Sequence, residues 1–87
     1  MTNISEGCKS ILRRMLYREI IGGKHIPIIF CYQWVKHLPK KEHKLALKDF
    51  EACIKEGLVL TKPTHSGKHV FLNPRKEMLN KIRFLIE

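Results

Sequence analysis

The sequence contains no long hydrophobic run. Its longest apolar stretch, residues 26–32, is interrupted by Pro27 and falls far short of the roughly 20 apolar residues that a helix needs to cross a bilayer. The N-terminal sequence MTNISEGCKS also lacks the order of a secretory signal, in which positive charge precedes an apolar stretch. These two absences predict a soluble, cytoplasmic protein without a membrane partner.

Cysteine is scarce too. The three cysteines, Cys8, Cys31 and Cys53, are odd in number and match neither a disulfide framework nor a zinc ribbon in their spacing. Cys31 and His37 could be combined into a zinc pair, but neither residue belongs to a C-x-x-C or H-x-x-x-H motif. We therefore favour free, buried thiols in a reducing compartment and expect no metal.

Motifs for catalysis are missing. The eight acidic residues are scattered and form no pair suited to acid–base chemistry. Ser66-Gly67-Lys68 resembles part of a phosphate-binding loop, but His69 stands where Ser or Thr is required, and no glycine precedes Gly67 by five residues. The sequence therefore predicts neither an enzyme nor a cofactor. We expect His65 and His69 to be exposed loop residues rather than metal ligands.

Positive charge is what the chain has in excess. Lysine and arginine number 17 against 8 acidic residues, which gives a formal net charge of +9 over 87 residues. With 44% hydrophobic residues the chain should fold, and its length fits a single domain, residues 1–87. Such a charge points to a polyanionic partner: nucleic acid first, an acidic protein or membrane surface second.

Apolar residues at steps of three and four predict four helices. The first covers residues 5–21, with Asn3 or Ser5 as its cap, and ends at Gly22-Gly23. The second covers residues 29–38. The third follows a short turn at residues 39–41 and ends near residue 56, with Gly57 as its cap. The last opens at Asn73-Pro74, because asparagine caps helices well and proline suits the first helical position.

Two regions indicate β-structure. Residues 24–28 carry β-branched side chains around Pro27, which suits a short edge strand because proline cannot donate to a ladder. Residues 58–61 and 69–72 are separated by a polar, basic turn at residues 62–68, and together they predict a hairpin.

The helix before Gly57 has two unlike faces on an ideal helical wheel. The apolar face comprises Ala46, Leu47, Phe50, Cys53 and Ile54, and the opposite face comprises Lys41, Lys44, Lys48 and Lys55. Leu45 lies beside the lysines. Phe50, like Phe30 and Trp34 of the preceding helix, lies at core spacing, so we expect these rings inside the protein. Arg13, Arg14 and Arg18 fall on the polar side of the first helix and contribute charge or solubility.

The order helix, short strand, helix, tight turn, helix, hairpin, helix resembles winged helix-turn-helix DNA-binding domains. The strongest local likeness is residues 47–59, LKDFEACIKEGLV, in which glycine, leucine and valine lead from the third helix into the wing. The sequence departs from many members at Pro39-Lys40-Lys41, where they carry a Ser or Thr cap.

The resemblance implies an α+β fold: a three-helix core, a wing of two or three strands with its tip at residues 64–68, and an added C-terminal helix. It also implies a transcriptional regulator that binds double-stranded DNA. Winged-helix regulators often pair through terminal helices, so we expect a homodimer through the C-terminal helix.

The residues support DNA binding on separate grounds, because the major groove admits one helix and a basic face suits it. We expect Lys44 and Lys48 to be the main contacts in the groove. The expected phosphate contacts are Lys41, Lys62, Ser66 and Lys68. The third helix has no Arg, Asn or Gln, the residues that more often read bases, so we expect strong backbone binding and weak sequence discrimination.

Two other functions stay open at this point. Lysine–phosphate contacts serve RNA as well as duplex DNA. Winged helices also act as protein-interaction modules, in which a basic face docks on an acidic partner. Exposure of Leu45 would favour that second alternative.

Overall fold

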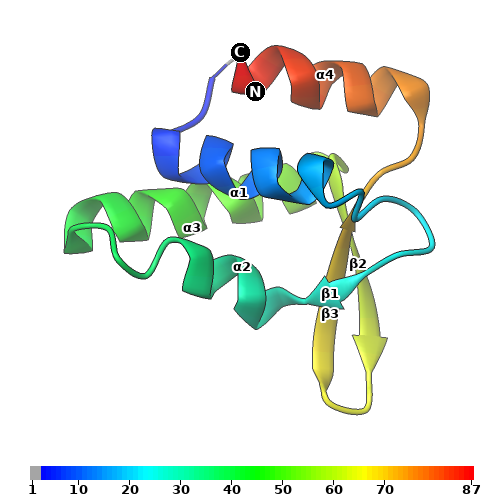
Figure 1. The fold of residues 1–87 in the computed structure, drawn as a ribbon, viewed down its shortest axis with the longest axis horizontal. Helices are drawn as coiled ribbons and strands as arrows, with labels where there is room; N and C mark the ends of the chain where they lie inside the picture. The colour runs from blue at the N-terminus through cyan, green and yellow to red at the C-terminus, as the bar shows by residue number, and fades with distance from the viewer. Residues whose placement is uncertain (1–2) are drawn as a thin grey trace.

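The computed structural model describes residues 3–87, which form four helices and one three-stranded antiparallel sheet (Figure 1). In chain order the elements are α1 (Glu6–Tyr17), β1 (Ile26–Pro27), α2 (Ile28–Trp34), α3 (Lys40–Lys55), β2 (Val59–Thr64), β3 (Gly67–Leu72) and α4 (Lys76–Ile86). The predicted α+β class and the predicted order of elements are confirmed. None of the helices in the described residues is long and apolar enough to span a membrane.

The sheet has the strand order β1-β3-β2. The β2–β3 hairpin projects away from the helices (Figure 1). Its register runs from Val59 opposite Leu72 to Thr64 opposite Gly67, which leaves a loop of His65 and Ser66. The predicted turn over residues 62–68 is therefore wrong, because the strands continue almost to the tip. Pro63 is tolerated within β2 because β2 is an edge strand.

β1 is the short edge strand that the sequence predicts around Pro27. It pairs antiparallel with β3, with Ile26 opposite Val70 and Pro27 opposite His69. α2 follows directly but ends at Trp34, four residues earlier than expected. There the His43 side chain of α3 donates from Nδ1 to the Val35 carbonyl oxygen at 2.9 Å, which ties the end of α2 to the first turns of α3.

α1 ends at Tyr17, whereas the periodicity predicts a helix up to residue 21. Glu19 adopts a left-handed conformation with φ 55° and donates from its backbone N to the Leu16 carbonyl, while Ile20 N donates to the Met15 carbonyl. This is the Schellman arrangement, which normally places glycine at the left-handed position. Ile20 is buried and Ile21 bridges to Leu72, so tertiary packing takes these two residues out of the helix.

The other helix ends confirm some caps and correct others. Ser5 caps α1, since its Oγ accepts from Cys8 N at 3.4 Å, and Gly57 ends α3 with φ 81°. Asn73 does not cap α4, whose N-cap is Arg75. The buried Asn73 side chain instead donates to the Gly57 carbonyl and accepts from Arg75 N, so it joins the end of α3 to the start of α4.

The core lies between α1, α3, α4 and one face of the sheet. Its largest fully buried side chains are Phe50, Ile11, Leu12, Met15, Ile20, Leu72 and Ile82. α1 crosses α3 at close range through Gly7: a Cβ at this position would stand 2.6 Å from the Cβ of Ala46. The expectation of buried thiols outside any disulfide is confirmed for Cys8, Cys31 and Cys53. Burial raises the pKa of Cys31 to about 12, so this thiol is protonated and unreactive at neutral pH.

Candidate nucleic-acid interface

α3 exposes all five of its lysines. They are Lys40, Lys41, Lys44, Lys48 and Lys55. The opposite side of the helix is buried through Ala46, Phe50 and Cys53, so the lysines face away from the core. Glu42 in the first turn and Lys55 in the last turn complement the helix dipole. The structure therefore places Lys41, Lys44 and Lys48 together on one solvent-facing surface, which we call the lysine stripe with Lys40 and Lys55 included.

A carboxylate interrupts the lysine stripe. Glu51 is exposed and stands three residues after Lys48 and four before Lys55, so it shares their side of the helix. Burial, and secondly the nearby Glu51 charge, raise the pKa of Tyr32 on α2. The same i,i+3 and i,i+4 spacing in the sequence reveals Glu51, which a helical wheel of the lysines alone leaves out.

Leu45 is exposed to 47% beside the lysine stripe, which bears on the alternative of a protein-interaction module. It borders a shallow cavity of about 330 Å³ between α3, Leu38 and the N-terminus of α1. Ser5 N donates to Asp49 Oδ2 at 2.7 Å nearby, which ties the start of α1 to α3. One exposed leucine of this kind is common on monomers and by itself does not define an interface.

The hairpin separates Lys62 and Lys68, although the sequence groups them. Residues directly opposite in an antiparallel pair share a face, and successive residues alternate. Lys68 pairs with Pro63 and stands two residues from the buried Val70. It therefore lies on the face of the hairpin that, closer to the helices, is buried in the core. Lys62 pairs with His69 and lies on the outer face. Ser66 is exposed at the tip between them.

The outer face of the sheet holds a histidine pair. His25 Nδ1 and His69 Nδ1 are 2.8 Å apart, so one nitrogen donates a hydrogen bond to the other. The rings meet edge to face with centroids 4.9 Å apart, and Phe71 lies next to His25. The prediction of an exposed loop position is therefore wrong for His69, which is half-buried in β3; it holds for His65. Among residues 3–87, no group of three or more potential ligands could hold a metal ion.

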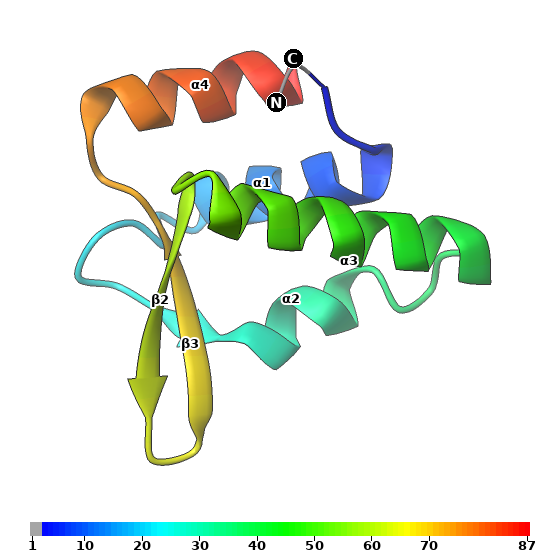
Figure 2. The same cartoon turned by 180° about the vertical axis from the view of Figure 1, so that it is seen from behind.

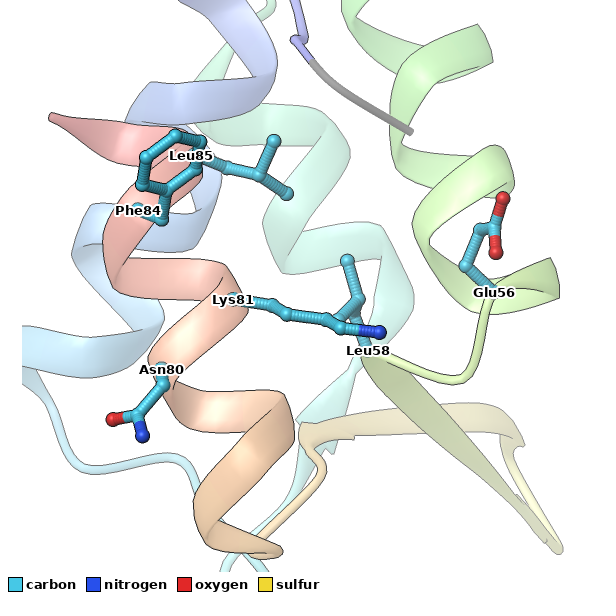
Figure 3. A pocket seen from close by; sticks show the side chains of 6 residues that line it. All are labelled: Glu56, Leu58, Asn80, Lys81, Phe84 and Leu85. Carbon is cyan, nitrogen blue, oxygen red and sulfur yellow. The ribbon is translucent and has the colours of Figure 1, made fainter.

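α4 covers one side of the core and leaves a cavity beside it. Ile82 and Leu85 are buried, and Arg13 of α1 donates from Nη2 to the Ile86 carbonyl at 2.9 Å, at the end of the helix. Between α4 and the α3–β2 turn lies a cavity of about 340 Å³ (Figure 3); its lining comprises Glu56, Leu58, Asn80, Lys81, Phe84 and Leu85. Lys81 reaches across it toward Leu58 (Figure 3), and Phe84 is exposed to 71% at its edge.

Comparisons with family models, with curated proteins and with solved structures find no match to this chain. The class of the protein therefore follows from its own architecture: a small basic α+β domain with a lysine-bearing third helix followed directly by a basic hairpin.

Proposed function

We propose that this chain is a winged-helix protein that binds double-stranded DNA and acts as a transcriptional regulator. The observation that carries the proposal is the lysine stripe, which faces solvent along α3 while the other side of the helix is fixed to the core. An isolated charged helix face is commonly only solvated. Here the helix leads through Gly57 directly into a hairpin with further cations, so the two elements offer one extended basic region.

The arrangement of the strands supports the winged-helix part of the proposal. Three helices pack around one core, and the short β1 pairs with the edge of β3 that β2 leaves open, which gives the strand order β1-β3-β2. The hairpin projects beyond the helices as a wing (Figure 2). A two-residue tip is narrow enough to approach a groove, and Lys62 and Lys68 on its two faces would then meet phosphates on either side.

Lysine chemistry sets the expected mode of binding. Lysine meets phosphate as a point charge, and α3 has none of the arginine, asparagine or glutamine side chains that commonly read bases. We therefore expect affinity that falls steeply with salt and discriminates little between sequences. No catalytic or cofactor role is part of this proposal, and the three buried thiols fit a reducing compartment such as the cytoplasm.

Pairing through α4 is the second part of the proposal. In a two-fold symmetric dimer, Phe84 of each copy would enter the cavity of its partner, between Leu58 and Leu85. The exposed ring supports this arrangement, because a monomer leaves it in water beside an apolar wall. Lys81 on one side of the cavity and Glu56 on the other offer charges of opposite sign across the symmetry axis.

DNA binding is tested by fluorescence anisotropy of a labelled random-sequence duplex over a series of salt concentrations. Lys44→Glu/Lys48→Glu should reduce the affinity strongly and make its salt dependence shallower, since it replaces two cations of the interface by anions. Lys76→Glu/Arg83→Glu on α4 is the control, because it makes the same change in charge away from α3. Equal losses in both variants would contradict the proposal and show that the net charge acts without a defined site.

Glu51→Gln is the complementary test, because it should increase the affinity by roughly two- to fivefold by removing the carboxylate from the lysine stripe. A gain cannot result from unfolding. An unchanged affinity would place Glu51, and with it this face of α3, outside the interface. The same titrations with duplex RNA distinguish the two nucleic acids: tighter binding to RNA would replace DNA in the proposal.

Pairing through α4 is tested by sedimentation. Phe84→Asp should convert a dimer into a monomer, whereas Tyr17→Asp should leave it intact, since Tyr17 is a still more exposed ring on another helix, at 89% against 71% for Phe84. A wild-type chain that is monomeric, or a dimer that only the Tyr17 variant disrupts, would refute pairing through α4.

A further inference from the structure

Two arginines lie on one tryptophan at the junction of α1 and α2. The guanidinium carbons of Arg14 and Arg18 stand 5.4 and 5.6 Å from the centre of the Trp34 ring. The arginines are one helical turn apart on the exposed side of α1, and Trp34 closes the last turn of α2. Its spacing predicts a core position for Trp34, which holds in part: the side chain packs against the core but is only half-buried, with the arginines over it.

These cations have no anionic partner within the part of the chain that the structure describes. Among residues 3–87, neither guanidinium forms a salt bridge, and both stand over the Trp34 ring. Lys24 adds a third positive charge, since its Nζ donates to the Arg18 carbonyl oxygen at 2.8 Å. Like charges one turn apart on a helix destabilise it. An anion received between the two guanidiniums would relieve that repulsion.

Large apolar side chains stand exposed beside the cations. Tyr17 is exposed to 89%, and Phe30 to 45%. Phe30 precedes Trp34 by one turn and shares its side of α2. It was expected in the core, and the structure corrects that prediction as well. Tyrosine, tryptophan and arginine are the residues most enriched among the energetic centres of protein interfaces.

The two arginines of this surface come from α1 and its C-cap, whereas the lysine stripe belongs to α3. α1 is nearer the viewer in Figure 1, and α3 is nearer in the opposite view of Figure 2. A duplex held by the lysine stripe would therefore lie on the side of α3 that faces away from α1. Binding of a partner at this surface does not depend on DNA binding by α3, so the absence of such a partner would leave the proposal of DNA binding unchanged.

We propose that the surface formed by Arg14, Tyr17, Arg18, Phe30 and Trp34 docks an acidic segment of another protein. We call it the arginine–tryptophan surface. Carboxylates of the segment would be received by the two guanidiniums, which can bind a carboxylate in a bidentate manner. An apolar side chain of the segment would cover Phe30. A nucleic-acid duplex fits this surface less well, because its outward phosphate backbone offers nothing apolar for Phe30 and Tyr17.

Stacking on Trp34 prepares the arginines for such a partner. A free arginine side chain loses rotamer freedom when it binds, whereas a guanidinium already held on a ring loses less. Trp34 also shields one side of each cation from water, which strengthens its attraction to a carboxylate. The arginine–tryptophan surface is thus ordered before the segment arrives.

The single tryptophan of the chain supplies the measurement, because its fluorescence reports directly on the proposed surface. The probe is a synthetic peptide that alternates glutamate with leucine, and the control peptide replaces each glutamate by glutamine. The acidic peptide should change the Trp34 fluorescence along a saturable binding curve, and the glutamine peptide should leave the fluorescence unchanged. Equal binding of both peptides would overturn the role of the arginines.

Two matched variants complete the test. Arg14→Gln/Arg18→Gln should lower the affinity for the acidic peptide by about tenfold or more. Lys44→Gln/Lys48→Gln removes the same charge from α3 and should leave peptide binding unchanged. All four positions are exposed, and circular dichroism checks the fold of both proteins. An equal loss of peptide affinity in the two variants would show that only the net charge of the protein attracts the peptide, and it would overturn the proposal. It would also be overturned if a DNA duplex changed Trp34 fluorescence through the arginines while the peptide did not.

Discussion

Gly7 permits the close crossing of α1 and α3, and its replacement by alanine tests the packing beneath the lysine stripe. An added Cβ would stand 2.6 Å from the Ala46 Cβ and 2.9 Å from Leu38 Cδ1. Both distances are below the contact that carbon atoms tolerate. The end of the Leu38 side chain can rotate away, but the Ala46 Cβ is fixed to the backbone of α3. The two helices must therefore separate locally.

The magnitude follows from two opposing effects. Overpacking of this kind costs about 1–3 kcal/mol. Alanine is better than glycine in a helix by up to ~1 kcal/mol, and by less in the first turn, where Gly7 lies. We therefore expect Gly7→Ala to lower the free energy of unfolding by about 1–2 kcal/mol, against the direction that helix propensity alone predicts.

Urea denaturation measures this change, and two further variants make it specific. Gly23→Ala is the control: a Cβ there meets nothing within 4 Å, so we expect a stability equal to or above that of the wild type. Ala46→Gly removes the opposing Cβ, so Gly7→Ala should cost far less in that background. The double-mutant cycle should give a coupling of about 1–2 kcal/mol. If Gly7→Ala is as stable as Gly23→Ala, or if the coupling is near zero, the close packing of α1 on α3 is refuted.

Three further predictions concern stability. Glu19→Gly should stabilise the chain by about 0.5–1 kcal/mol in urea denaturation, because glycine adopts the left-handed conformation without strain; a loss of stability would contradict the Schellman end of α1. Asn73→Ala should cost about 1–3 kcal/mol, since it removes the hydrogen bonds to the Gly57 carbonyl and Arg75 N, and a neutral result would mean that these bonds contribute nothing net. For Cys31 the folded pKa of about 12 exceeds the ordinary value of 9.0, so the folded state holds the proton more tightly. The Cys31 thiol should therefore add no pH dependence to the stability below its ordinary pKa, and it should lower the stability as the pH rises from there toward about 12. The urea midpoint of Cys31→Ala should decline less than that of the wild type over this range. Parallel profiles of the two proteins would contradict the raised pKa.

The sequence predicted helix ends and strands correctly where they depend on a few neighbouring residues. Gly57 ends α3, Ser5 caps α1 and Pro27 marks an edge strand, each for a reason confined to a few neighbouring residues. The lysine stripe could be predicted for the same reason, because helical spacing alone determines which side chains share a side. The errors arose where distant residues intervene. Ile20 fits the helical period of α1, yet the core and the sheet take it out of the helix.

The candidate site shows the same division. Lys62 and Lys68 are neighbours in a basic hairpin by sequence, but they point to opposite faces because the strands run on to a two-residue tip. The sequence predicts a loop position for His69, but in the structure it lies in β3, where His25 contacts it. Phe30 and Trp34 have the spacing of core residues, but Phe30 is exposed to 45%, and Trp34 packs against the edge of the core, half-buried, with two arginines over its ring.

By itself the sequence determined the charge, the α+β class, the order of the elements and the side of α3 that carries the lysines, because composition and backbone periodicity act over a few residues. Only the tertiary structure decided which apolar side chains are buried, which hairpin face each lysine occupies and which residues meet Arg14 and Arg18. Those outcomes depend on the competition of distant segments for one small core, and a local pattern cannot record that competition.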